Sequence, residues 1–257
     1  MRYPITVPTL LVLAGSALAE DSLASKFDVH GFFTQGYTKS TNNTYLADDS
    51  KSGSWDLSSV ALNVGCQVTD RFRLAAQFYG ENLWQEGETQ DVSFARQKIQ
   101  LDLLFAQYSV RDWLGVRVGR IKQPFGLYNE TQDFDNTRVS AILPQSVYDV
   151  RAREYHFAVN GIGIYGSVQA GQIGSFDYQA FYGNQQIPSD GTVAKQYQSP
   201  DVGLKGITLD RIMGAQVFWN APSGKLEGLK LGFSYRHTKN LNAEAYLPNN
   251  IPFGQWH

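Results

Sequence analysis

The sequence predicts an all-β fold, an antiparallel β-barrel of about nine strands that spans a membrane. Three observations predict it. Apolar residues recur at every second position over many segments, several of these segments are longer than typical soluble strands, and their connections alternate between short and long. Transmembrane barrels combine these features because alternate residues face lipid, while the turns on one side of the membrane stay short.

The clearest strands are two alternating runs around Thr69-Asp70. The first carries Val60, Leu62, Val64, Cys66 and Val68, and the second carries Phe72, Leu74, Ala76 and Phe78. A two-residue link between such runs predicts a tight hairpin. Seven further segments alternate in the same way: about 27–38, 95–110, 115–122, 154–169, 174–184, 211–220 and 229–238. No helix is expected in residues 20–257.

The connections suggest which ends of the strands lie on the same side of the membrane. The short ones centre on 69–70, 111–114, 171–173 and 222–225, and the long ones cover about 39–54, 85–94, 123–153 and 185–210. Outer-membrane barrels have short periplasmic turns and long outside loops. Tyrosine and tryptophan near the strand ends fit an interfacial aromatic girdle, although any sheet is enriched in these residues.

The composition excludes several other classes of protein. Mean hydropathy is −0.31, which suits a barrel because only alternate residues face lipid. Net charge is −2, which gives no reason to expect a nucleic-acid partner. Cys66 is the only cysteine, so disulfides do not hold the fold, and a structural thiol on a strand is expected.

The N-terminus resembles a cleaved secretory signal peptide. Arg2 is followed by a mostly apolar stretch from Val7 to Leu18, and Ala17-Leu18-Ala19 is a small-x-small cleavage box. We therefore expect residues 1–19 to be a signal peptide and residues 20–257 to be the barrel domain. Export together with a barrel predicts the outer membrane of a Gram-negative bacterium.

The C-terminal segment is expected to leave the barrel incomplete. Asn240 to His257 is polar and contains two prolines, which favours a loop over a closing strand. Nine strands would depart from the even number of single-chain bacterial barrels, and an open sheet edge is very costly in lipid. The sequence thus predicts an N-terminal piece of a larger barrel; the alternative is a smaller closed barrel that residues 241–257 complete.

One short motif resembles a known family. The segment Val116–Glu130 contains Gly119, Arg120, Lys122, Pro124, Phe125 and Gly126 in the pattern Gly-Arg-x-Lys-x-Pro-Phe-Gly. This resembles bacterial outer-membrane porins of the phosphate-selective porin O and P type and their wider superfamily. The resemblance implies a passive channel for small hydrophilic solutes or ions, a third outside loop (123–153) folded into the lumen, and a homotrimer. No lysine ladder of the phosphate-selective members matches here.

The charged residues predict a pore constriction. The third long connection carries an acidic group (Glu130, Asp133, Asp135) and a basic group (Arg138, Arg151, Arg153). Four bases fall on predicted inward faces of the strands: Arg71, Arg73, Lys98 and Arg117. Acids on the loop facing bases on the wall would create a field across the lumen that weights ion selectivity. The alternative is that these charges are solvated or pair locally.

Other functional motifs are weak. Gly161-Ile-Gly-Ile-Tyr-Gly166 matches the dinucleotide-binding pattern but is followed by strand-like residues, so no cofactor is expected, and no metal site is recognised. A barrel hydrolase is one alternative, because Glu154 and His156 would share one strand face. A non-conducting sleeve or receptor for a partner is another. We expect a non-enzymatic channel in contact with outer-membrane lipid.

Overall fold

The computed structural model describes residues 23–41, 50–55, 57–81, 99–131, 143–149 and 152–247, together with the backbone of 251–256. These residues are mostly antiparallel β-sheet, which confirms the all-β prediction. The predicted signal peptide, residues 1–19, lies outside the described residues. The strands are β1 (Phe27–Gln35), β2 (Ser58–Thr69), β3 (Phe72–Glu81), β4 (Gln100–Arg111), β5 (Leu114–Lys122), β6 (Ala158–Gln169), β7 (Ser175–Pro188), β8 (Gly203–Asn220), β9 (Lys230–Leu247) and β10 (Ile251–Trp256).

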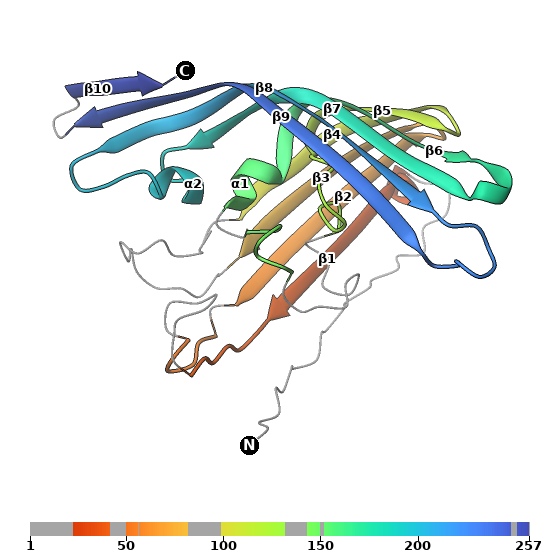
Figure 1. The fold of residues 1–257 in the computed structure, drawn as a ribbon, viewed down its shortest axis with the longest axis horizontal. Coiled ribbons are helices and arrows are strands. Elements are labelled where there is room, and N and C mark those ends of the chain that lie inside the picture. Colours follow the sequence, from red (N-terminus) through yellow and green to blue (C-terminus); the bar gives the residue numbers. More distant parts are fainter. Residues whose placement is uncertain are drawn as a thin grey trace. The chain divides into compact units, whose positions relative to one another are not determined.

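The chain divides into two compact units. The smaller comprises residues 1–68 and 75–102, and the larger comprises residues 69–74 and 103–257. Within each unit, strands that are consecutive in the sequence are neighbours in the sheet. Figure 1 shows this meander for the larger unit, where β4 to β9 run side by side.

In the smaller unit, the register of β1 and β2 confirms the predicted alternation. Phe27 lies opposite Cys66, Val29 opposite Val64, and Phe33 opposite Val60, so all six side chains share one face. Phe27 and Val29 are more than half exposed. Cys66 is a free thiol on this apolar face.

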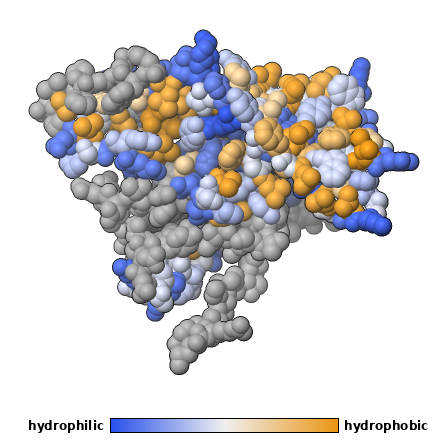
Figure 2. All heavy atoms as spheres, viewed as in Figure 1, coloured by the Kyte–Doolittle hydropathy of each residue, from blue (hydrophilic) through white to orange (hydrophobic). Residues whose placement is uncertain are grey.

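In the larger unit, one face of the sheet is apolar and exposed. Cross-strand pairing aligns Val118, Ile162, Tyr182 and Met213 in one row over four strands. We call this surface the outer face. Its large side chains are 39–70% exposed and include Leu104, Tyr108, Val118, Ile162, Ile164, Val168, Tyr182, Met213, Val217, Leu231, Phe233 and Tyr235. Figure 2 shows orange, hydrophobic side chains gathered where Figure 1 places these strands.

The opposite face of the same sheet, called here the inner face, is covered by the protein itself. Two short helices lie against it, α1 (Arg153–His156) and α2 (Thr192–Lys195), and Figure 1 shows α1 beside the sheet. A hydrophobic core joins them to the strands, with members from β5, β6, β7, β8, β9 and α2: Ile121, Val159, Phe181, Ile187, Ala194, Ile207, Leu209, Ile212 and Ala243.

Aromatic side chains secure the short turns of the larger unit. Trp219 Nε1 donates a hydrogen bond of 2.6 Å to Ile173 O, and the Tyr178 hydroxyl donates one of 2.6 Å to Trp113 O. Trp113 and Ile173 are both more than half exposed. This end of the sheet therefore carries an aromatic rim of the kind that suits a membrane interface.

The prediction of strand over residues 154–157 was wrong. These residues form α1 and the turn after it, and β6 begins only at Ala158. His156, predicted on a strand face, is therefore helical, and the prediction of no helix fails for α1 and α2. Helices of four residues are too short to show a 3.6-residue periodicity, so the sequence pattern gives no sign of them. Among the described residues, no helix is long and apolar enough to cross a lipid bilayer.

The prediction of a loop from Asn240 onwards was also wrong. Strand β9 continues to Leu247, and β10 pairs with it from Ile251 to Trp256. Strand β7 likewise extends to Pro188 and β8 starts at Gly203, so the fourth long connection covers 189–202 rather than 185–210. The extension of β9 has polar residues on one face and small residues such as Ala243 and Ala245 on the other, which hides the apolar alternation. The extensions of β7 and β8 instead bury aliphatic side chains such as Ile187 and Leu209.

Candidate functional site

The third long connection starts by crossing the inner face of the larger unit. Gly126 N donates to the Ser234 hydroxyl at 3.3 Å, and Gln216 Nε2 donates to Gly126 O at 2.5 Å. Gln216 and Ser234 are cross-strand partners on β8 and β9. Because the connection leaves from β5, these two bonds show that it folds inward over the sheet.

The beginning of the connection is fixed by two buried amides. Gln123, which is fully buried, donates from Nε2 to Tyr155 O at 3.2 Å and to Ala158 O at 3.1 Å. Asn129 Nδ2 donates to Gln123 O and, at 3.3 Å, to His156 O. These buried N–H donors hold the backbone geometry, because a buried donor left unpaired costs free energy. The side-chain oxygens of Gln123 and Asn129 are buried without a hydrogen-bond partner among the described residues. The loop from Gln123 to Asn129 is thereby fastened to α1.

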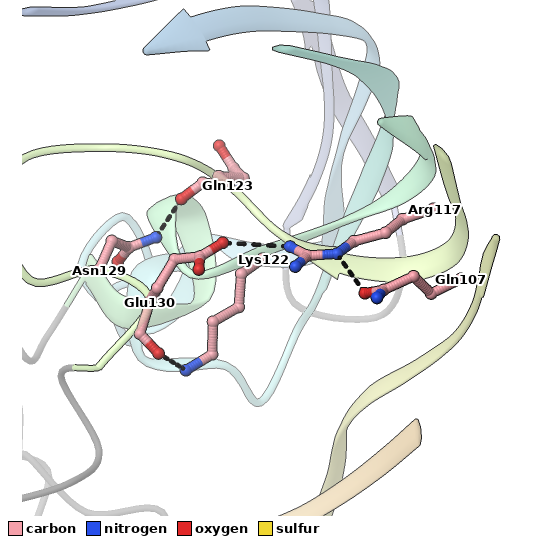
Figure 3. Close-up of polar contacts among 6 residues, drawn as sticks. All are labelled: Gln107, Arg117, Lys122, Gln123, Asn129 and Glu130. Carbon is pink, nitrogen blue, oxygen red and sulfur yellow. Dashed lines mark hydrogen bonds and ion pairs between the residues drawn. The ribbon is translucent and has the colours of Figure 1, made fainter. Parts of the chain in front are cut away.

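An acid of this connection meets a base of the wall. Arg117 lies on the inner face of β5, and its Nη1 is 3.1 Å from Glu130 Oε1. Its Nε donates to Gln107 Oε1 at 3.0 Å, and its guanidinium lies 4.4 Å from the centre of the Tyr165 ring. Lys122 Nζ donates to Glu130 O at 2.7 Å. Figure 3 shows Glu130 held between these two basic side chains.

Two further arginines lie beside helix α1 on the inner face, Arg153 of α1 itself and Arg236 of β9. The Arg236 guanidinium of β9 lies 3.7 Å from the centre of the Tyr155 ring and donates to Tyr155 O at 3.0 Å. Arg153 stacks at 3.6 Å on the ring of Phe157 and is almost fully buried. Gln185 of β7 donates to Glu154 O. These contacts attach α1 to both β7 and β9.

His156 lies among these groups. Burial, and then the charges of Arg236 and Arg153, lower the pKa of His156 from 6.5 to about 4, while Asp149 opposes the shift. The Phe125 ring stands edge-on to the imidazole at 6.2 Å. His156 is therefore neutral at neutral pH, and protonating it would put a third positive charge beside two arginines.

The lowered pKa of His156 makes the folded state less stable at acidic pH. Since the folded pKa lies below the unfolded one, stability is full above about pH 6.5 and falls as the pH drops towards 4. We expect wild type to lose about 3 kcal/mol of unfolding free energy between pH 7 and pH 4 relative to His156→Gln, at about 1.4 kcal/mol per pKa unit. Urea unfolding at the two pH values measures it. His30→Gln, at an exposed strand position, is the control; equal pH dependence of wild type and His156→Gln would contradict the prediction.

The predicted site residues divide into three groups. Asp133, Asp135, Arg138, Arg151 and Lys98 lie outside the described residues. Arg71 and Arg73 are exposed, at the short-turn end of β3. Arg117 and Glu130 form the ion pair, and Arg153 lies in α1. Whether these charges form a pore constriction stays a prediction.

The sequence reasoning did not single out four polar side chains that hold the connection and α1: Gln123, Gln185, Gln216 and Arg236. Two of them carried a usable signal. Gln216 and Arg236 stand at polar positions of alternating strands, which is the criterion that selected Arg117. Gln185 falls in the predicted fourth long connection and Gln123 follows the last residue of β5, so neither shows a pattern.

The motif residues shape the end of β5 and the start of the connection. Gly119 has φ of +128°, and an added Cβ would lie 2.3 Å from Leu104 O, so only glycine fits there. Gly126 has φ of +61° beneath the Tyr148 hydroxyl. Arg120 faces Leu104 and Asn160 across the sheet, and Pro124 follows Gln123 directly. The motif thus has a local structural role, and the family resemblance stays a prediction.

Other chemistry finds little support in the described residues. Gly161–Gly166 lies inside β6, which continues to Gln169, whereas dinucleotide binding requires a helix after the glycines. Within the described ranges, no group of three or more histidine, cysteine or acidic residues is placed to hold a metal ion. No known protein family matches the chain, and no curated protein is significantly similar to it.

Proposed function

We propose that this chain is an outer-membrane β-barrel channel through which small hydrophilic solutes or ions diffuse passively. The proposal includes export by cleavage after Ala19, insertion of the strands into lipid, and closure of the sheet around a lumen. The inner face of the larger unit would line that lumen, with Arg117 and Glu130 at its constriction.

The observation that carries the proposal is that the sheet of the larger unit exposes apolar side chains on its outer face and has charged side chains on its inner face. On the outer face, aliphatic and aromatic side chains stay exposed in row after row over β4 to β9. The charged Arg117 and Arg236 lie on the inner face instead. Large apolar patches are rare on proteins in water, whereas lipid solvates such a surface favourably.

The inward course of the third connection favours a channel over an empty sleeve. Its bonds to Ser234 and Gln216 bring Glu130 opposite a wall base, where the pair acts on a passing ion through its field. The hydrolase alternative loses its geometric basis, because Glu154 and His156 lie in α1 and do not share a strand face. Glu154 Oε2 accepts a bond from Val193 N at 3.5 Å.

Conductance across planar bilayers tests the proposal, with cysteines as reporters of the lumen. The protein without residues 1–19 is refolded with Cys66→Ser, which removes the only native thiol. Ser167→Cys then places a thiol on the inner face, and Ile164→Cys places one on the outer face. We expect discrete ion-conducting steps that a charged, water-soluble thiol reagent alters in Ser167→Cys and leaves unchanged in Ile164→Cys.

Three other results would each change the proposal. Steps without any difference between the two cysteines would contradict the assignment of the faces. Conductance that appears only when further strands are supplied would support the incomplete barrel predicted from the sequence. Insertion without conductance in any form would favour the sleeve or receptor.

A further inference from the structure

The outer face changes character near one end of β8 and β9. The pairing of β7 with β8 shifts between Gly183 and Gln185, and Asn240 of β9 has a positive φ of 59°. On the turn side of this irregularity the outer face carries apolar rows. On the other side it carries hydrogen-bonded polar groups, such as Asn242 Nδ2 on Asp210 Oδ2 at 2.9 Å. The outward positions of β9 from Leu231 to Lys239 span nine residues, the length with which a tilted strand crosses a bilayer core. Leu231, Phe233 and Tyr235 make up the apolar part, and His237 and Lys239 end it.

Three basic side chains stand at this boundary. His237 lies opposite Met213, in the row that also contains Tyr182. In the next row outward, Arg211 and Lys239 lie directly opposite each other. All three are exposed, and each follows the outward alternation of its strand. We call Arg211, His237 and Lys239 the boundary bases.

Within the described residues, none of the boundary bases forms a hydrogen bond or an ion pair through its side chain. The nearest acids on the hairpin make other contacts: Asp210 accepts from the neutral amide of Asn242 at 2.9 Å, and Glu244 pairs with Lys205 at 3.1 Å. Like charges directly opposite each other, about 5 Å apart at Cβ, destabilise a sheet. An anion from outside the chain would turn this repulsion into attraction.

We propose that the boundary bases bind the phosphate of an anionic membrane-lipid headgroup. The inference rests on the proposed function, because the outer face must be in lipid. Its position fits: the apolar rows meet acyl chains, His237 shares the last of these rows with Tyr182, and Arg211 and Lys239 stand one row beyond. Guanidinium and ammonium groups form charge-assisted hydrogen bonds with phosphate oxygens, and a histidine ring N–H adds another donor.

Lipid preference of the full mature chain tests this inference. Wild type is refolded into phosphatidylcholine vesicles and into vesicles that also contain phosphatidylglycerol, and lipid affinity is measured by exchange with a spin-labelled phosphatidylglycerol. We expect the double variant Arg211→Gln/Lys239→Gln to lose the preference for the anionic lipid by about fivefold for each base removed. Lys205→Gln is the matched control, a base of the same hairpin that already has an acidic partner, and should keep the preference.

Higher ionic strength should reduce the wild-type preference, since the bases are exposed. Equal preference in wild type and in the double variant, or equal loss in Lys205→Gln, would overturn the headgroup site while leaving the channel proposal intact. Failure of wild type to insert into either vesicle, seen as full digestion by added protease, would overturn both. The two failures are therefore distinguishable.

Discussion

Ile164→Arg is expected to destabilise the membrane-inserted protein by about 2–4 kcal/mol, the cost of an arginine on the lipid face near the middle of the bilayer. Ile164 lies in the middle part of β6, where Val116 and Ala180 are its partners on either side. It is 43% exposed, so the larger side chain creates no clash within the protein. The expected loss of stability therefore comes from placing a charged side chain in lipid, and not from altered packing within the protein.

Ser167→Arg provides the matched control on the same strand. Ser167 is exposed on the inner face, opposite Asp177, where an added guanidinium meets water and a carboxylate. A surface substitution of this kind should stay within about 0.5 kcal/mol of wild type. Reversible urea unfolding of both variants from phospholipid vesicles measures the difference. If Ile164→Arg proves as harmless as Ser167→Arg, the outer face is not in lipid, and the channel proposal fails with it.

The strands and their two faces were predictable because period-two alternation is a local property of the chain. Val116, Val118, Ile162 and Ile164 alternate with Arg117 and Gly163 in the sequence, and the register of β5 and β6 places them on the expected faces. The short turns were predictable for the same reason, since Gly171 to Ile173 and Pro222 to Lys225 separate clear alternating runs. Each of these features requires no knowledge of distant residues.

The polar strand extensions and the helices could not be predicted in this way. Beyond the apolar rows, Asn242 and Glu244 face outward, so the alternation contrasts polar with small residues and resembles a loop. Backbone pairing with β8 and β10 decides that this segment is strand, and such pairing is not encoded locally. Helix α1 is likewise stabilised by Gln185 and Arg236, which lie far from it in the sequence.

The candidate site was predictable in its elements but not in its contacts. A base in the middle of a strand should avoid lipid, which selected Arg117, and the acids of the third connection selected Glu130. That these two meet depends on the path of the loop, which the bonds of Gly126 to Ser234 and Gln216 determine. Loop paths depend on such tertiary contacts. The sequence therefore identifies the charged residues but does not determine which of them form a pair.

Removing the charge of Glu130 and removing the charge of Arg117 are expected to change ion selectivity in opposite directions. Glu130→Gln leaves the positive charge of Arg117 uncompensated, and Arg117→Gln leaves the negative charge of Glu130 uncompensated. A unit charge about 4 Å from an ion in water is worth about 1 kcal/mol. The effect has opposite signs for anions and cations, so it changes their ratio by about 2 kcal/mol. We therefore expect the anion-to-cation permeability ratio to rise roughly 30-fold in Glu130→Gln and to fall roughly 30-fold in Arg117→Gln. The reversal potential under a salt gradient measures both.

The double variant Arg117→Gln/Glu130→Gln separates charge from structure. If the field of the pair sets selectivity, removing both charges should restore a ratio close to that of wild type, because each single variant exposes only the charge of its partner. Lys230→Gln is the control, since Lys230 lies at the short-turn end of β9, 3.8 Å from Asp177, and should leave the ratio unchanged. If the permeability ratio shifts in the same direction in both single variants, the loop has moved. Glu130 would then have lost its contacts with Lys122 and Arg117, and the wider lumen would discriminate less between ions.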